Sequence, residues 1–434
     1  MARLNVAAKS TAKTHEGAPA FGHLKPIQQL RRSVLACLLW ENEFYEDGKS
    51  IADRISETAA IVKPAELASL AIEARKVFNL RHVPLLLLDA LSRTGPKLMA
   101  DTTARVISRA DEMGELLTVY WRNGRKSVPR QMRKGLQQAF TKFDEYQLAK
   151  YDRDGSVKLR DVLRIARPKP INDEQSALWK RVKDRSLKTP DTWEVSLSAG
   201  ADKKETFERL IRERNLGYLA LLRNLRNMAT AGVDTDIVRN AIVARKGGAE
   251  RVFPFRYVAA ARAAPQFEPS LDQALCEAIA ELPIYLGKTA ILIDVSGSMD
   301  WKLSAKSDMK RIDAAAALGA IIPGDIRLFT FSNSIAEVPP RRGMAGVDAI
   351  VKSQPHGGTN LGAAVEWINA NVKADRLIVI TDEQSHDAVP NSFAKGYMIN
   401  VASAKNGVGY GAWTHIDGFS EGVLRYIHEA ERDS

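Results

Sequence analysis

The stretch TAILIDVSGS, Thr289 to Ser298, decides the fold of the C-terminal part of this 434-residue chain. Its first six residues form a continuous apolar run that ends in an acid, which is typical of a buried strand in a parallel sheet. Two similar runs follow, IRLFTF at 326–331 and RLIVITD at 376–382, and residues 397–401 form a fourth. These runs predict the strands of one sheet.

Helical patterns lie between these strands, at 308–321 and 361–372. Apolar strands that alternate with helices are typical of a Rossmann-like parallel sheet covered by helices on both faces. The character of the sequence changes near Pro283, so we assign residues 285–434 to this α/β domain.

Side chains with oxygen atoms lie at the ends of three of these predicted strands and helices, where the chain passes into or out of a loop. Asp294, Ser296 and Ser298 form a DxSxS pattern after the first strand, Thr359 precedes a helix, and Asp382 ends a later strand. Binding sites in open parallel sheets lie beyond the carboxyl ends of the strands, so we expect these oxygens to face one point. Such hard ligands suit a divalent cation, Mg²⁺ in the first place and Mn²⁺ as the alternative.

This pattern resembles the metal-ion-dependent adhesion site of von Willebrand factor type A domains. Hydroxyl ligands add no charge, so the bound ion would stay able to accept an external acidic group. The alternative interpretation is that Ser296 and Ser298 only cap a helix while the two acids line the end of the sheet. No nucleophile–base pair accompanies these residues, so we expect no enzyme activity and assign no catalytic residue.

The first two thirds of the chain have a helical pattern. From Ile27 to about Leu282, apolar residues recur at helical spacing, and Gly and Pro interrupt them at short intervals. The pattern predicts short paired helices, arranged either as an α-solenoid or as a globular bundle. We assign residues 27–284 to this helical domain and the polar residues 1–26 to an N-terminal arm.

Charge separates the two parts of the chain. Residues 1–280 hold 48 Lys and Arg against 34 Asp and Glu, a net charge of +14, whereas residues 281–434 hold 15 against 18, a net of −3. Within residues 121–190, 19 basic and 8 acidic residues give +11, the same excess as the whole chain. This density predicts a polyanionic partner such as RNA.

The cations of this stretch are our candidate RNA contacts. Arg130, Arg133 and Lys134 share one stripe of a helix by their spacing, and Trp121 beside them is the best candidate to stack on a base. The alternative is an ordinary solvated helical face. The full candidate set is Arg122, Arg125, Lys126, Arg130, Arg133, Lys134, Arg160, Arg164, Arg167 and Lys169.

Composition excludes several classes of protein. The chain has two cysteines, Cys37 and Cys276, so neither a disulfide framework nor a Cys-rich zinc site is expected. No apolar run reaches the roughly 18 residues that a membrane span needs. The N-terminus has no apolar core of a signal peptide, so we expect a cytoplasmic protein with no membrane partner.

Several segments resemble the TROVE domain of the Ro ribonucleoprotein family, whose members include bacterial and phage proteins. Matching segments are LRRSVL at 30–35, RDVLR at 160–164, RPKP at 167–170, LRNLRNM at 222–228 and NGVGY at 406–410. The resemblance covers nearly the whole chain. It implies a monomeric ring of HEAT-like helical repeats that a von Willebrand factor type A domain closes.

The resemblance also implies a function. Proteins of this family bind small noncoding Y RNA on an outer basic surface and take single-stranded 3′ ends of misfolded or structured RNA into the central hole. Bacterial relatives act in RNA maturation and decay with an exoribonuclease such as polynucleotide phosphorylase. We therefore expect an RNA-binding scaffold in RNA quality control. The alternative is a metal-dependent protein-interaction module of the adhesion or chaperone-accessory type.

Overall fold

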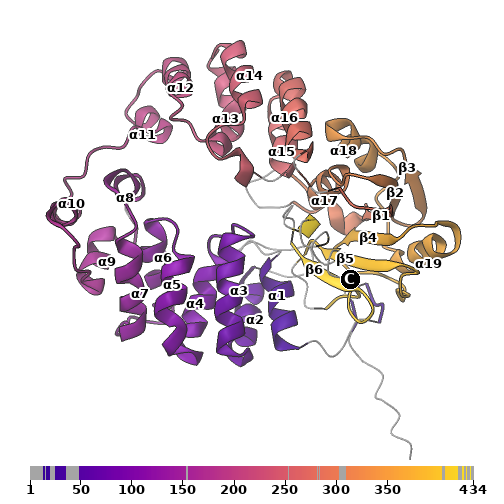
Figure 1. Cartoon of the computed structure of the whole chain (residues 1–434), viewed down its shortest axis with the longest axis horizontal. Coiled ribbons are helices and arrows are strands. Elements are labelled where there is room, and N and C mark those ends of the chain that lie inside the picture. The colour runs from indigo at the N-terminus through magenta and orange to yellow at the C-terminus, as the bar shows by residue number, and fades with distance from the viewer. Residues whose placement is uncertain are drawn as a thin grey trace, which may run out of the picture. The chain divides into compact units, whose positions relative to one another are not determined.

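A computed structural model shows helices along the first part of the chain and a sheet in the last part (Figure 1). The predicted arm at 1–26 and Cys37 lie largely outside the residues that the structure describes. Within the described part, no helix is both long and apolar enough to cross a membrane. The described residues are 13–14, 16–19, 25–35, 48–152, 155–252, 254–280, 282, 284–302, 309–402, 406–418, 423–424, 427 and 431.

The chain divides into two compact units, each of which is described by itself. The helical unit comprises residues 52–217 and 227–238. The sheet unit comprises residues 1–51, 218–226 and 239–434. This division follows contacts in space, whereas the domain boundaries drawn along the sequence remain predictions.

The helical unit is a stack of short helices. Helix α3 (Pro64–Lys76) packs on α4 (Val83–Thr94) and on α5 (Met99–Val106), and α4 also packs on α6 (Asp111–Tyr120). Helix α5 packs in turn on α7 (Arg130–Phe140). Each of α3, α4 and α5 thus contacts both a neighbouring helix and the next helix but one, which is the pattern of stacked helical pairs. The predicted α-solenoid character is confirmed.

The remaining helices continue this unit or cross its boundary. Helix α9 packs on both α6 and α7, and α10 packs on α9. Their bounds are α2 Gly48–Ile61, α8 Glu145–Tyr151, α9 Leu159–Ala166, α10 Asp173–Asp184, α11 Trp193–Ser198, α12 Lys203–Arg212, α13 Tyr218–Thr230 and α14 Thr235–Ala244.

Helix α7 shows why these helices pack closely. Met132, Leu136 and Phe140 are fully buried on one side, while its cations remain exposed. Gly135 faces α5, where a Cβ atom would lie 2.6 Å from the Cβ of Thr103. Glycine therefore lets the two helices approach, and the cations of α7 stand on a rigid support.

The sheet has six strands in the order β3-β2-β1-β4-β5-β6. All neighbouring strands are parallel except β2 and β3, which are antiparallel. The predicted strands are confirmed as β1, β2, β4 and β5, and the sequence did not predict β3 or β6. The bounds are β1 Lys288–Asp294, β2 Asp325–Phe331, β3 Ile335–Val338, β4 Arg376–Thr381, β5 Lys395–Asn400 and β6 Thr414–Asp417.

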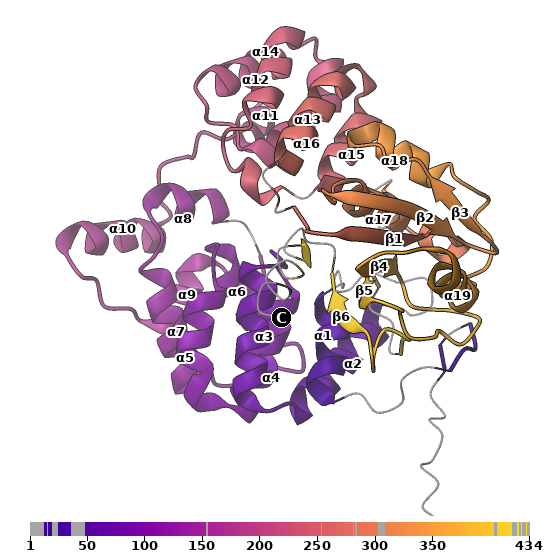
Figure 2. The ribbon, with the colours of Figure 1, turned by 45° about the vertical axis from the view of Figure 1, so that its right-hand side comes forward.

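Helices cover both faces of this sheet, as predicted. On one face, Val365 and Ile368 of α19 (Leu361–Asn371) pack against Leu292 and Phe329 of the strands. On the other face, α17 (Arg311–Ala320) contacts β1 and β4, and α18 (Gly343–Val351) packs on α17. The strands lie between α18 and α19 in both views (Figures 1 and 2).

Three more helices of the sheet unit come from the part of the chain that the sequence assigned to the helical domain. Helix α15 (Pro254–Ala263) packs on α17, and α16 (Glu268–Ala280) packs on α18. Helix α1 (Pro26–Leu35) contacts β6 at one edge of the sheet. The N-terminal helix thus belongs to the sheet unit, although it precedes the helical repeats in sequence.

Candidate metal centre and nucleic-acid interface

Three loops converge at the carboxyl end of the sheet. Asp294 ends β1, Asp382 follows β4 directly, and Thr359 precedes α19. The five predicted ligands in these loops are all buried. The backbone N–H of Gly297 donates to the carbonyl of Gly357 at 2.8 Å, which joins the first loop to the second. The structure therefore brings together the three segments that contain the predicted ligands.

Asp294 and the two serines form one compact group. The Oγ atoms of Ser296 and Ser298 are 3.2 Å apart. Asp294 accepts hydrogen bonds from the backbone N–H of Ser296 at 2.9 Å and from the hydroxyl of Thr381 at 2.6 Å. Ser296 precedes a short 3₁₀ helix at Gly297–Asp300, but its side chain makes no capping hydrogen bond there. The alternative that Ser296 serves only as a cap is not supported.

Asp382 has an unsatisfied oxygen. Its Oδ1 accepts from the backbone N–H of Gln384 at 3.1 Å, whereas its buried Oδ2 has no hydrogen-bond partner among the described residues. Burial, and then the charge of Asp382, raises the pKa of Asp294. A cation between the two carboxylates would relieve both the repulsion and the missing partner, so the donor set fits an ion with oxygen ligands.

The serine and threonine hydroxyls are necessary to this interpretation. Within the described part of the chain, no three His, Cys, Asp or Glu side chains gather where they could hold a metal. Two carboxylates alone make an incomplete set for Mg²⁺, which takes six oxygens. Hydroxyls and water would supply the rest.

A buried ionic cluster stands directly behind Asp382. Arg32 of α1 and Glu383 are fully buried, with Nη1 and Oε2 2.6 Å apart, and His415 Nε2 lies 2.6 Å from Glu383 Oε1. Burial raises the pKa of Glu383, but the charges of Arg32 and His415 outweigh it and lower this pKa to about 2. The ring of Tyr410 stacks on His415 with centroids 4.0 Å apart. This cluster fastens α1 to the loop that carries Asp382.

The N-terminal segment holds the same loop at a second place. The Thr14 hydroxyl donates to the carbonyl of Ser385 at 2.7 Å. His386 Nδ1 accepts from the backbone N–H of Thr359 at 3.0 Å, and its Nε2 lies 2.6 Å from a carboxylate oxygen of Glu16. Glu16 and His386 therefore position the Thr359 loop. Sequence reasoning missed this support, because more than 340 positions separate Thr359 from Glu16 in the chain.

The predicted RNA contacts lie on neighbouring elements of the helical unit. Arg122, Arg125 and Lys126 belong to the loop between α6 and α7, and the others lie on α7, on α9 or just after α9. All are exposed except Arg160, which is half-buried. Arg122 lies 3.8 Å from Asp89 and donates to Ser56 Oγ at 3.2 Å. The other candidates form no ion pair within the described part of the chain.

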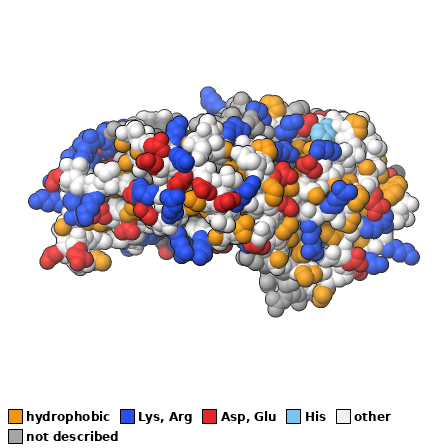
Figure 3. Space-filling model, turned by 90° about the horizontal axis from the view of Figure 1, so that it is seen from above, with side chains coloured by type: hydrophobic (Ala, Val, Ile, Leu, Met, Phe, Trp, Pro, Cys, Tyr) orange, Lys and Arg blue, Asp and Glu red, His pale blue; other side chains and the backbone are white. Residues whose placement is uncertain are grey.

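Elsewhere the surface charges are mixed. On the face seen in Figure 3, Lys and Arg side chains alternate with Asp and Glu. Several of these cations are neutralised locally, such as Arg209 by Asp191 at 2.7 Å and Arg181 by Glu145 at 2.9 Å. The cations of α7 and α9 differ from these because no carboxylate among the described residues pairs with them.

A family comparison identifies the helical part. The TROVE domain matches the chain over residues 37–185 and 175–282, which together span more than half of it. The chain belongs to the TROVE domain family. Membership supports RNA binding as the general activity of this TROVE protein and confirms the predicted relationship to Ro-like proteins.

A solved structure agrees with the fold of this TROVE protein. The Ro (RSR) protein of Deinococcus radiodurans is similar with a TM-score of 0.62, over 94% of this chain and 100% of that chain. The two sequences are 18% identical. At that identity the likeness shows a common fold, helices followed by a mostly parallel sheet, and carries no residue-level assignment.

Proposed function

We propose that this TROVE protein is a non-enzymatic RNA-binding scaffold. The observation that carries the proposal is the group of exposed cations on α7 and α9 that no carboxylate in the described part neutralises. Cations held apart on rigid helices displace condensed counterions from phosphates, which makes binding favourable and dependent on salt. Arginines also pair with phosphate oxygens in a bidentate geometry.

The ligands in this proposal are those of Ro-like proteins. A small noncoding Y-like RNA binds the cations of α7 and α9, and single-stranded 3′ ends of misfolded or structured RNA enter a monomeric ring. The protein acts in the cytoplasm in RNA quality control, maturation or decay, with an exoribonuclease such as polynucleotide phosphorylase as its partner. Family membership and the unpaired cations support this.

The sheet unit would bind one divalent cation, Mg²⁺ or alternatively Mn²⁺. Its ligands are Asp294, Ser296, Ser298, Thr359 and Asp382, and the unsatisfied Oδ2 of Asp382 supports the proposal. A bound ion would supply an electrophilic centre for an external carboxylate. The two carboxylates would balance the charge of the ion, and the three hydroxyls would bring the protein ligands to five, so one of the six positions around Mg²⁺ would stay open to that external carboxylate.

RNA binding is tested by titrating a small structured RNA in gel-shift assays at several salt concentrations. Changing Arg130, Arg133 and Lys134 together to Glu should weaken binding strongly at low salt. The matched control reverses three exposed lysines away from α7 and α9, namely Lys203, Lys204 and Lys373. Equal weakening by both triple variants, or no binding by the wild type, contradicts the proposal.

The sheet edge favours a second function, that of a metal-dependent protein-interaction module. Oδ2 of Asp382 has no hydrogen-bond partner among the described residues and could bind the metal ion that such a module needs. The variant Asp294→Ala separates the two functions. It should leave RNA affinity nearly intact if the first proposal holds. If the protein is mainly an interaction module, the same variant should abolish capture of an acidic protein partner, and the triple Glu variant should have no effect on that capture.

A further inference from the structure

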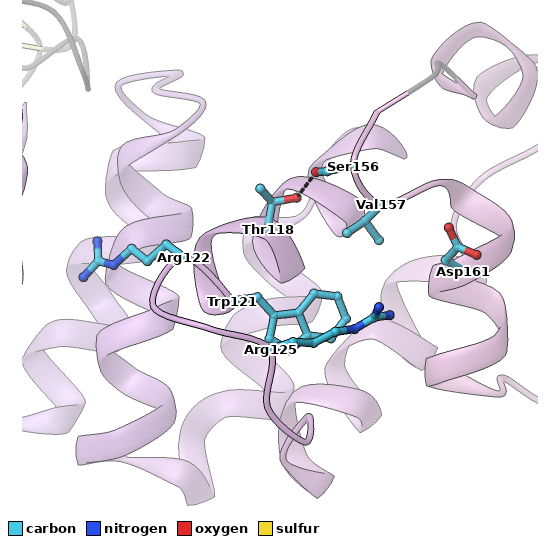
Figure 4. Close-up of a pocket in the computed structure, with 7 residues that line it drawn as sticks. All are labelled: Thr118, Trp121, Arg122, Arg125, Ser156, Val157 and Asp161. Atoms are coloured by element: carbon cyan, nitrogen blue, oxygen red, sulfur yellow. Dashed lines mark hydrogen bonds between the residues drawn. The ribbon is translucent and has the colours of Figure 1, made fainter.

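A pocket of about 310 Å³ opens on the helical unit between the end of α6 and the start of α9 (Figure 4). This volume is at the small end of the range for small-molecule sites, which suits one planar group such as a nucleobase. The pocket lies among the candidate RNA contacts. Its lining residues are Thr118, Trp121, Arg122, Arg125, Ser156, Val157 and Asp161.

One wall of the pocket is a fixed aromatic and cationic surface. The indole Nε1 of Trp121 donates to the carbonyl of Lys126 at 2.7 Å, which holds the ring in place. The guanidinium carbon of Arg125 lies 4.9 Å from the centre of the ring. In Figure 4, Arg125 extends along the indole, whereas Arg122 points away from it. Indole faces and guanidinium planes both stack on bases.

The other wall carries Asp161, the one acid among the residues that line the pocket. Its Oδ2 accepts from the backbone N–H of Lys158 at 3.1 Å, which anchors the side chain in the first turn of α9. Neither Asp161 nor Arg125 forms an ion pair within the described part of the chain. Beyond its role in the first turn of α9, this carboxylate can contact a bound RNA favourably only through groups that donate hydrogen bonds, because it repels phosphate.

We propose that this pocket takes one unpaired base of a bound RNA and prefers guanine. The proposal rests on the proposed RNA-binding function and names the group that this site recognises. The base stacks on the surface formed by Trp121 and Arg125, with its Watson–Crick edge toward Asp161.

The preference follows from the donors on each base. Guanine offers two adjacent donors, N1–H and the 2-amino group, to the two oxygens of a carboxylate. Adenine and cytosine offer one amino group beside a ring nitrogen that repels the carboxylate, and uracil offers one N–H between two carbonyls. Bidentate pairs of this kind discriminate between bases by about tenfold or more.

The test uses the full chain and four labelled heptamers, U7 and its variants with G, A or C at the central position. Fluorescence anisotropy at one fixed salt concentration gives each Kd. The wild type should bind the G heptamer about tenfold more tightly than the other three. The variant Asp161→Asn, which keeps an acceptor for the backbone N–H of Lys158, should lose this preference. Trp121→Leu should weaken binding of all four.

The matched control is Asp184→Asn, which makes the same change of charge at an exposed position of α10. It should keep the preference for the G heptamer. Equal Kd values for the four heptamers in the wild type, or a preference that survives in Asp161→Asn, would overturn the proposal. If the structured RNA binds and the heptamers show no preference, only the pocket proposal fails. If no RNA binds at all, the proposed function fails with it.

Discussion

The sheet edge and the surface of α7 and α9 organise charge in opposite ways. At the sheet edge, the carboxylates of Asp294 and Asp382 are buried together, because β1 and β4 pair side by side although they are far apart in the sequence. On α7 and α9, the cations other than half-buried Arg160 are exposed, and all of them are close in sequence and held apart by the helical geometry. Metal binding at the buried site should therefore depend on each ligand. RNA binding by the exposed surface should depend on how many of its cations remain.

The largest expected effect is on the ionic cluster behind the sheet edge. Arg32→Met removes one of the two partners, Arg32 and His415, that lie 2.6 Å from the buried carboxylate of Glu383, and it should lower the free energy of unfolding by about 3–5 kcal/mol. The control is Arg327→Met, which removes an exposed pair with Glu337 at 2.8 Å and should cost less than about 1 kcal/mol. Urea denaturation followed by circular dichroism measures both. If the two variants lost a similar free energy of unfolding, the buried ion pair would be no more important to stability than the exposed one, contrary to this prediction.

The next effect is that of a metal ion. Mg²⁺ at about a hundred times its Kd should stabilise the wild type by about 2.7 kcal/mol, seen as a higher melting temperature. Asp382→Asn should remove this gain, because it replaces a charged ligand. Without metal, the same variant should be at least as stable as the wild type, since it relieves the repulsion with Asp294. The control Asp348→Asn, at an exposed position of α18, should respond to Mg²⁺ like the wild type.

Stabilisation by Mg²⁺ should weaken as the pH falls, and it should do so before the pH reaches the ordinary carboxyl range. Burial and the charge of Asp382 raise the pKa of Asp294, so protons compete with the ion at a pH where an exposed carboxyl group is still ionised. The Mg²⁺-dependent shift in melting temperature, measured from pH 8 downward, should shrink well above pH 4. A shift that stays constant down to the ordinary carboxyl range would show that Asp294 does not bind the ion.

A smaller effect concerns Glu383, whose pKa is lowered by the fold, whereas the pKa of Asp294 is raised. Its pKa in the folded protein is about 2, below the ordinary value of 4.5, so ionisation favours the folded state. The stability that it contributes is complete above pH 4.5 and is lost as the pH falls toward 2. Between these values, urea denaturation should show a weaker loss of stability with falling pH in Glu383→Gln than in the wild type. Parallel pH profiles would contradict this.

Much of the fold could be predicted because its strands have a continuous apolar sequence. Strands β1 and β4 are buried along nearly their whole length, so they lack polar positions that would obscure them. Strands β3 and β6 were missed because each has four residues and lies at an edge of the sheet, where half-exposed positions mix polar and apolar residues. The helices were predictable from their period but not their stacking, which depends on contacts such as that of Gly135.

The candidate site was predictable where residue types alone set the chemistry. The DxSxS pattern, Thr359 and Asp382 identify hard oxygen ligands, and Trp121 was recognisable as a stacking residue beside cations. Arg32 could not be paired with Glu383, because 351 positions separate them and nothing local marks either residue. Asp161 was hidden for another reason, since an acid within a dense run of cations is indistinguishable from an ordinary counter-charge until the pocket is seen.

The most direct test of the central claim is the salt dependence of RNA affinity in three proteins. Kd for one small structured RNA is measured from low to moderate salt for the wild type, the Arg130, Arg133 and Lys134 triple Glu variant, and Asp294→Ala. The logarithmic salt slope of the triple variant should be smaller by about 2–3, while Asp294→Ala should keep the slope of the wild type. An unchanged slope in the triple variant, or an equal loss in Asp294→Ala, would contradict the assignment of RNA binding to α7 and α9.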